Sequence, residues 1–407
     1  MENSKSINHR LAPRMCLIAA MSYNVTLAST FGTFSIFLEA VEQQLKVTRE
    51  ISSLGLAFVM VGIAGTSPFV GGLTSKISLR VLMIVGLIMQ ASAYMLLCVS
   101  RNIVISLVVY LVLIGPGLCL TATVLPATLV MRWYRINRGR ALGLVFISVG
   151  LTIMPLAASY SLNKVGLSMT YLALALLLLC TVVPALFVRD WPPDISETLT
   201  GTDTEHRKVG EMAVGGVLKR KDFWSLTLAY ASITMISTIL TSFLVSMVKP
   251  WGIDGIRAAS LLSILAFAGM AGTVVFGAIA DRMGAARALT LLCLNTAILW
   301  VLMLTAPRYI LLVPLVGLMG FHAAAASGVF AASISDHFGD LDFTRAFGLG
   351  NMISLPFGVL AIPLAAWVFV RTGSYASALL GMIIFLLLAA SAAFMTRRRG
   401  IALMHDT

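Results

Sequence analysis

Long apolar segments separated by short polar turns recur along the whole chain. Twelve such segments lie near residues 15–41, 51–74, 80–99, 103–131, 139–161, 167–188, 223–249, 257–280, 287–306, 309–335, 345–370 and 375–395. A helix needs about 20 apolar residues to cross a hydrocarbon core, and within lipid the helix satisfies its own backbone groups. The pattern therefore predicts an all-α polytopic membrane protein with twelve transmembrane helices, numbered here as spans 1 to 12.

The second half of the chain resembles the first. Gly277, which begins the turn GAIADRMGAAR, lies 205 positions after Gly72, which begins GLTSKISLR. Arg345 in RAFG likewise lies 205 positions after Arg140 in RALG. Two pseudo-symmetric repeats of apolar helices are typical of alternating-access transporters.

One long hydrophilic segment interrupts the apolar pattern, at residues 189–222. It falls between the sixth and seventh spans and therefore predicts a linker between two halves. We expect a six-helix bundle over residues 1–188 and a second over residues 223–407.

Composition and charge fit this prediction. The 407 residues are 59% hydrophobic and 11% charged, with a mean hydropathy of +0.95, which excludes an ordinary soluble domain. Of the 29 Lys and Arg, 21 fall on the side that holds the N-terminus, so we expect both termini and the linker in the cytoplasm and the protein in the cell (inner) membrane. The net charge of +12 then reflects topology and lipid headgroups, not nucleic acid.

The five cysteines show no CxxC spacing and read as small apolar fillers. We expect no metal and no other cofactor. We also expect no enzyme activity, because the spans hold no clustered carboxylates and no nucleophile–base pair. A nucleotide-binding loop is missing as well, so an ion gradient must drive any transport.

The turn between spans 8 and 9 carries a candidate gate. Its glycines permit close helix approach, and Asp281, next to Arg282, can cap a helix start or receive arginine side chains. In the first-half copy Ser75 stands where the acid would be, with Lys76 and Arg80 retained. A plain basic turn at the membrane surface is the alternative.

Arg140 and Arg345 extend the gating hypothesis. Each begins a helix at the inner face of its half, so pairing with carboxylates or helix C-termini would affect the balance between inward-open and outward-open states. The alternative is an interfacial anchor whose charge reaches the headgroups.

The chain resembles the major facilitator superfamily in three features. These are two sets of six spans, a long middle loop and the GxxxDRxGxxR turn. Within the superfamily, residues 132–150 and 337–352, with Gly373-Ser374-Tyr375 after span 11, resemble the monocarboxylate transporter and oxalate–formate antiporter branch. The drug-efflux branches of the superfamily have a span 5 rich in Gly and Pro. Span 5 of this chain contains Pro155 without a cluster of glycines, which argues against those branches. The resemblance implies that spans 1, 4, 7 and 10 line a central cavity.

Polar residues recur at helical spacing on spans 1 and 7, and Gly115-Pro116-Gly117 loosens span 4. These stripes could line a water-filled cavity. Hydrogen bonds from the hydroxyls to neighbouring helices would explain them equally well. The predicted substrate contacts are Tyr23, Asn24, Thr26, Thr30, Thr121, Thr123, Tyr230, Thr234, His322 and Asn351.

His322 is the one titratable group near the middle of a span, and ionisable groups in membranes are functional candidates. A histidine titrates near neutral pH, so His322 is the predicted proton carrier or anion contact, with a neutral, hydrogen-bonded histidine as the alternative. Glu39, near the outer end of span 1, is a second candidate proton acceptor. Spans 8 and 11 lack a basic residue in their cores, which favours a singly charged acid over a dianion.

These features predict a secondary active transporter, acting as a monomer, that moves a small organic solute. The substrate class they favour is a monocarboxylate or a related organic anion, coupled to protons. Efflux of lipophilic compounds and uptake of a neutral solute stay open. A receptor-like membrane protein is the alternative from another class, and the short tails offer it no signalling domain.

Overall fold

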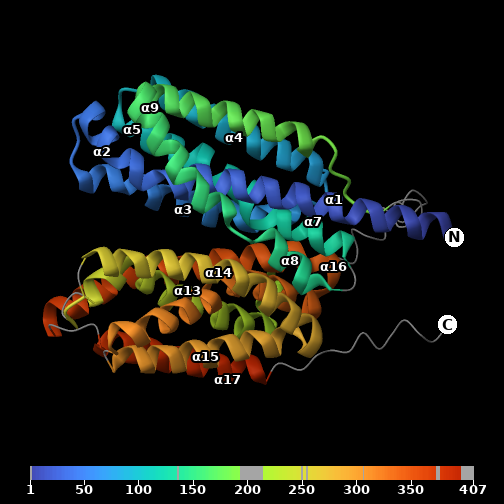
Figure 1. Ribbon diagram of the computed structural model, residues 1–407. Coiled ribbons are helices and arrows are strands. Elements are labelled where there is room, and N and C mark those ends of the chain that lie inside the picture. Colours follow the sequence, from blue (N-terminus) through green and yellow to red (C-terminus); the bar gives the residue numbers. More distant parts are fainter. Residues whose placement is uncertain are drawn as a thin grey trace. The chain divides into compact units, whose positions relative to one another are not determined.

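The computed structural model describes residues 2–134, 137–192, 214–248, 251–253, 255–305, 307–372 and 376–395. These residues form helices joined by short turns, with no strand among them (Figure 1). Most of the predicted linker, residues 193–213, lies outside the described part.

Within the described ranges, nine helices are long and apolar enough to cross a membrane. Two of the predicted twelve spans share one such helix, Arg138–Ala185, and the helix that contains Tyr309–Gly339 runs on to Thr372 and includes span 11. Leu379–Phe394 is a shorter apolar helix at span 12. Every predicted span therefore has its helix, and the predicted all-α polytopic fold is confirmed.

The chain divides into two compact units. The first contains Met1–Arg135, Val145–Glu211 and Phe347–Met352, and the second contains Ile136–Leu144, Met212–Ala346 and Ile353–Thr407. The units follow chain order except for two short segments, one at the start of span 5 and one in span 11.

The helices of spans 1 to 6 are interrupted by three π-helical turns. In chain order they are α1 (Glu2–Leu27), η1 (Ala28–Gly32), α2 (Thr33–Leu45), α3 (Arg49–Leu73), α4 (Leu79–Val99), α5 (Ile103–Val109), η2 (Tyr110–Ile114), α6 (Gly115–Leu118), η3 (Cys119–Val124), α7 (Leu125–Trp133), α8 (Arg138–Val145) and α9 (Val149–Ala185).

The helices of spans 7 to 12 are longer and carry no π turn in the described part. They are α13 (Lys221–Val248), α14 (Gly255–Met283), α15 (Ala285–Leu304), α16 (Tyr309–Thr372) and α17 (Ala376–Phe394), preceded by the short α12 (Val214–Leu218).

Two glycines divide helices that would otherwise be too long for one bilayer crossing. Gly166 in α9 has φ +79° and Gly339 in α16 has φ +71°, a left-handed conformation that residues with a Cβ avoid. Each lies at a kink between two helices, so Gly166 separates spans 5 and 6, and Gly339 separates spans 10 and 11.

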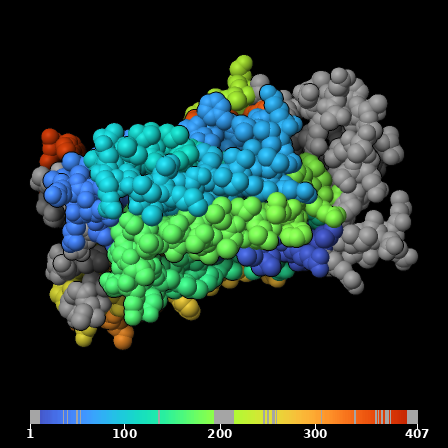
Figure 2. All heavy atoms as spheres, turned by 90° about the horizontal axis from the view of Figure 1, so that it is seen from above, coloured from blue at the N-terminus to red at the C-terminus, as the bar shows by residue number. Residues whose placement is uncertain are grey.

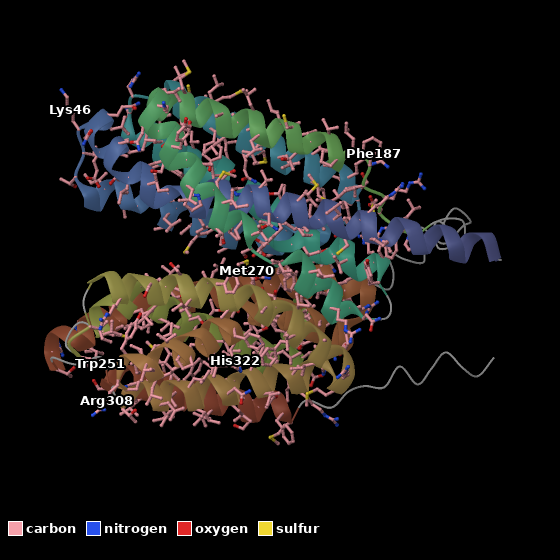
Figure 3. The ribbon with its side chains drawn as sticks, viewed as in Figure 1. Lys46, Phe187, Trp251, Met270, Arg308 and His322 are labelled. Atoms are coloured by element: carbon pink, nitrogen blue, oxygen red, sulfur yellow. The ribbon has the colours of Figure 1, made fainter. Side chains whose placement is uncertain are left out.

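The first unit exposes apolar side chains on its outer face. Helices α4 and α9 pack along each other and lie side by side on the surface in Figure 2. Leu96 and Val99 of α4 and Leu156, Leu176 and Phe187 near or in α9 are exposed. In water such a surface would aggregate, so these side chains face lipid. Figure 3 shows Lys46 and Phe187 at opposite ends of this unit.

Glycines permit very close helix contacts in both units. A Cβ at Gly117 of α6 would meet the side chain of Gln90 and the carbonyl of Gly86 in α4. In the second unit a Cβ at Gly272 of α14 would overlap the carbonyl of Phe321 in α16. Small residues at helix crossings drive packing in membranes, where the hydrophobic effect between helices is weak.

Candidate functional site

The first candidate site lies where span 5 is broken. Helix α8 ends at Val145 and α9 begins at Val149, so Phe146–Ser148 interrupt a helix inside the apolar stretch. The backbone groups freed by such a break must be satisfied within the protein. The side chain of Asn24 in α1 accepts a hydrogen bond from the Gly150 amide over 2.8 Å.

Tyr23 holds the same break from the next position on α1. Its hydroxyl is 3.1 Å from the Ser148 hydroxyl, and its ring meets Phe146 edge-on at 5.1 Å. The structure thus brings the predicted contacts Tyr23 and Asn24 together with Ser148, which sequence reasoning missed. No proline stands in the segment Phe146–Gly150 to signal a break there.

A second polar group lies where α1, α4 and the π turn η3 meet. Ser22 donates to the Thr121 carbonyl over 2.9 Å, and Gln90 donates to the Thr121 hydroxyl over 2.7 Å. Thr121 itself donates to the Gly117 carbonyl. Sequence reasoning chose Thr121 but missed Ser22 and Gln90. The signal for Gln90 was an amide inside an otherwise apolar span 3.

The remaining hydroxyls predicted on spans 1 and 4 bond mainly to backbone carbonyls. Thr26 donates to the Ser22 carbonyl over 2.7 Å, and Thr123 is 3.4 Å from the Leu118 carbonyl. Thr30 is the exception, because its hydroxyl is 3.2 Å from the Tyr94 hydroxyl of α4.

In the second unit, His322 lies on α16 midway along the helices, away from the end marked by Trp251 and Arg308 (Figure 3). It is 7% exposed, and the Phe276 and Phe321 rings lie 5.0 and 5.7 Å from its own. Its Nδ1 is 2.6 Å from the Leu318 carbonyl, which can only accept, so Nδ1 carries a hydrogen. The lone pair of a neutral imidazole is then on Nε2.

Tyr230 of α13 stacks on Phe330 of α16, with ring centroids 4.4 Å apart and an interplanar angle of 3°. Thr234 donates to the Tyr230 carbonyl of its own helix over 3.0 Å. These predicted contacts lie in the second unit with His322. Asn351 belongs to the first unit, where its amide donates to the Phe347 carbonyl one turn back.

The candidate gate is assembled in the second unit. The carboxylate of Asp281, at the end of α14, accepts the Gly139 amide over 2.6 Å and the Arg140 amide over 3.0 Å. These amides belong to the first turn of α8, where they have no partner within the helix, so the Asp281 side chain caps that helix. Gly139 and Gly277 let the two backbones touch, because a Cβ on either would overlap the other.

The basic residues of the predicted gate have different surroundings. The Arg140 and Arg282 side chains are exposed, and it is the backbone of Arg140 that meets Asp281. Arg345 is half-buried near the start of the span 11 part of α16. The side chain of Glu39 lies outside the described part, and no cluster of three potential metal ligands occurs in the part searched.

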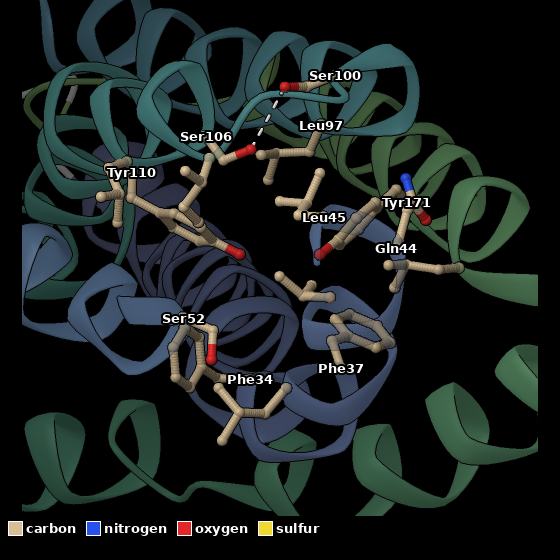
Figure 4. Close-up of a pocket in the computed structure, with 15 residues that line it drawn as sticks. Phe34, Phe37, Gln44, Leu45, Ser52, Leu97, Ser100, Ser106, Tyr110 and Tyr171 are labelled. Atoms are coloured by element: carbon tan, nitrogen blue, oxygen red, sulfur yellow. Dashed lines mark hydrogen bonds between the residues drawn. The ribbon is translucent and has the colours of Figure 1, made fainter. Parts of the chain in front are cut away.

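A pocket opens inside the first unit, between α2, α3, α4, α5, η2 and α9 (Figure 4). Its walls include Phe34 and Phe37, and the hydroxyls of Tyr110 and Tyr171 point toward each other across it. Ser52, which also lines it, donates to Glu42 over 3.3 Å. Among the described residues that line the pocket there is no Lys, Arg or His, so these walls offer no cationic side chain to an anion.

A family model and several known proteins are similar to this chain in sequence. The family model described as the Major Facilitator Superfamily matches residues 19–299. The chain is 27% identical to monocarboxylate transporter 13 of Rattus norvegicus over 358 residues, covering 85% of this chain and 79% of that protein. The Bos taurus protein of the same name is 26% identical over 351 residues, with the same coverage. The predicted resemblance to monocarboxylate transporters is confirmed.

Solved structures share the fold. The Escherichia coli fucose:proton symporter FucP superposes with a TM-score of 0.73 at 16% identity, covering 94% of this chain and 98% of that chain. The proton:xylose symporter XylE, bound to 6-bromo-6-deoxy-D-glucose, superposes with a TM-score of 0.68 at 12% identity and covers 95% of each chain.

Proposed function

Because the chain belongs to the major facilitator superfamily, we propose that this multi-pass membrane transporter carries a small monocarboxylate together with a proton. Two relatives are named monocarboxylate transporters, and two structural neighbours are titled proton symporters. As the sequence has no nucleotide-binding loop, the proton gradient would supply the energy.

The observation that carries the proposal is the setting of His322. Its Nδ1–H is committed to the Leu318 carbonyl, and no described residue bonds its Nε2. A proton taken up at Nε2 creates an imidazolium next to the Phe276 and Phe321 rings, where an isolated charge is costly. A carboxylate that arrives with the proton neutralises that charge, so proton and anion bind together and leave together.

The proposed architecture has two six-helix bundles, 1–188 and 223–407, joined by the linker 189–222. They rock as a monomer in the cell membrane, with both termini in the cytoplasm as the basic excess favours. Asp281 supports a gate at the cytoplasmic side, because it joins the start of span 5 to the end of span 8. Arg140, Arg282 and Arg345 would adjust the electrostatics of that gate.

The break in span 5 is the proposed hinge. The chain passes from the second unit to the first between Leu144 and Val145, directly before the interruption at Phe146–Ser148. A helix without its intrahelical bonds bends at low cost, and the side chains of Tyr23 and Asn24 fix the bend in this state.

A neutral solute is the second candidate. The polar groups around the break are hydroxyls and an amide without a basic side chain among them, a set suited to an uncharged hydroxyl-bearing molecule. Uptake of a neutral solute without inhibition by acids would favour this alternative.

Uptake by proteoliposomes tests the proposal. The purified protein is given labelled acetate, lactate, pyruvate, benzoate or oxalate, with and without an inward proton gradient. We expect gradient-stimulated uptake of a monoacid that its relatives inhibit, and little uptake of oxalate. Failure to take up any acid under either condition would contradict the carboxylate assignment.

A further inference from the structure

The π turns of the first unit change the hydrogen bonding of the backbone in the same way. In a π turn an amide bonds to the carbonyl five residues back, as the Gly115 amide does to the Tyr110 carbonyl. Where the chain returns to α-helix, one carbonyl loses its intrahelical partner. All three π turns lie in spans 1 and 4.

Proline accounts for the free carbonyl in span 4. Five residues after Thr121 stands Pro126, which has no amide hydrogen. The Ser22 hydroxyl of α1 takes that place and donates to the Thr121 carbonyl over 2.9 Å. Leu111 and Pro116 repeat the spacing at η2, where the Leu111 carbonyl lies directly against Gly62 of α3.

Span 1 has the same arrangement. The carbonyl of Ser29, within η1, accepts the Tyr94 hydroxyl of α4 over 2.6 Å as well as the Thr33 hydroxyl over 2.6 Å. In each π turn, therefore, a neighbouring helix contacts a carbonyl that a regular α-helix would bond internally. The π turns join spans 1, 2, 3 and 4.

Gln90 stabilises the η3 turn from span 3. It is fully buried, donates to the Thr121 hydroxyl, and leaves its own Oε1 without a hydrogen-bond partner in the described structure. An unpaired buried amide oxygen is unfavourable for stability. The bond to the Thr121 hydroxyl is therefore the one that ties the Gln90 side chain to its surroundings in the described structure.

These contacts lie in a line that ends at the break in span 5. Gln90 bonds Thr121, Thr121 bonds Ser22, and the two residues that follow Ser22 are the two that hold the break. Because adjacent residues on a helix move together, the bond at Ser22 sets the rotation of α1. We refer to Gln90, Thr121, Ser22, Tyr23 and Asn24 as the polar belt.

We propose that Ser22 and Gln90 are positioning residues of the transporter: by holding span 4 in the π register they fix the rotation of α1 that places Tyr23 and Asn24 on the break. The proposal deepens the proposed function, since it assigns the belt to the control of the proposed hinge. Neither residue needs to touch substrate.

A double-mutant cycle with proline tests the belt without any substrate. Ser22→Ala leaves the Thr121 carbonyl unpaired, whereas Pro126→Ala restores an amide hydrogen at the position that the π register presents to it. In the wild-type background we expect Ser22→Ala to speed hydrogen exchange of residues 149–152 roughly two- to tenfold. In the Pro126→Ala background we expect that increase to disappear.

The control is Ser92→Ala, because Ser92 is half-buried and its hydroxyl donates to the Ile88 carbonyl of its own helix. It should leave exchange at residues 149–152 unchanged. Ser22→Cys replaces the hydroxyl with a much weaker donor of similar size and takes the place of Ser22→Ala if that variant does not fold. Equal effects of Ser22→Ala in both backgrounds, or no effect at residues 149–152, would overturn the proposal.

Transport by the same variants separates this proposal from the proposed function. If a monoacid is carried, Ser22→Ala and Gln90→Leu should lower the maximal rate several-fold and change KM little, because they act on the hinge. If neither the wild type nor any variant carries an acid, the proposed substrate is wrong. The hydrogen-exchange measurements still test the role of the polar belt.

Discussion

The two units solve the problem of polar groups in lipid in different ways. The first combines a broken helix, three π turns and side chains that bond across helices, such as Ser22 to Thr121 and Asn24 to Gly150. The described helices of the second unit keep their α register. There Thr234 bonds to its own helix, the hydroxyls of Ser260 and Tyr309 meet across two helices, and Asp281 supplies a charge at the start of another helix.

The difference separates two tasks. Interruptions held by side chains make the first unit adjustable, because a bend there exchanges one hydrogen bond for another. The second unit offers His322 in aromatic surroundings, where a proton changes the local charge decisively. We therefore propose that motion and proton coupling belong to different units, and each proposal has its own test.

The largest expected effect is at His322. His322→Gln removes the proton acceptor, and we expect gradient-driven uptake to fall more than about tenfold, since the loss of a buried ion pair costs about 3–5 kcal/mol. Wild-type uptake should increase as the outside pH is lowered, because the protonated ring is the form that binds the anion. The variant should show a flat pH profile.

His337 provides a matched control for that experiment. It is also 7% exposed, and its Nδ1 also lies near a carbonyl one turn back, that of Ser333 at 2.9 Å. It lies near the end of span 10, so His337→Gln should retain the wild-type pH profile. A normal profile in His322→Gln would mean that His322 is structural.

The next largest effect is at the gate. Asp281→Asn removes the charge that caps α8, and we expect the inward-open state to gain about 1–2 kcal/mol, or roughly a five- to thirtyfold change in its ratio to the outward-open state. Distances between spin labels, one in each bundle of a cysteine-free protein, would measure this ratio. Asp336→Asn is the control, since Asp336 reaches the Ala285 amide only at 3.4 Å.

The membrane made much of this fold predictable from sequence. Apolar length determines helix number, so the spans ending at Trp133 or beginning at Leu79 lie near the predicted positions. The proline at 116 also signalled a loosened span 4. What one sequence does not contain is the pairing of partners: Ser22 and Thr121 are 99 residues apart, and nothing local links them.

The break in span 5 could not be predicted from the sequence for a related reason. Ser148 and Gly150 are compatible with a helix, and the interruption is stabilised by Asn24, which is 126 residues from Gly150. Only part of the candidate site could therefore be predicted from the sequence. Tyr23, Asn24 and His322 stood out as polar residues in apolar runs, whereas the groups that position them did not.

Two asparagines allow a smaller and sharper comparison. Asn24 and Asn351 both donate to a carbonyl one turn back, but Asn24 also accepts the Gly150 amide of another helix. Asn24→Ala should destabilise the purified protein by about 1 kcal/mol, the usual cost of losing a helix cap, and Asn351→Ala by less. Thermal unfolding in detergent compares them, and equal losses would show that Asn24 does not hold the break.

The smallest expected difference is between the hydroxyl stripes of spans 1 and 7. Thr30 meets the Tyr94 hydroxyl of another helix, whereas Thr234 bonds only to Tyr230 of its own helix among the contacts seen. Thr30→Val should therefore cost about 1 kcal/mol, and Thr234→Val less than about 0.5 kcal/mol. If Thr234→Val leaves stability intact but raises KM for the transported acid, the span 7 stripe faces substrate. If Thr30→Val does so while stability is unchanged, the first unit is not held together by its hydroxyls, and the contrast between the units fails.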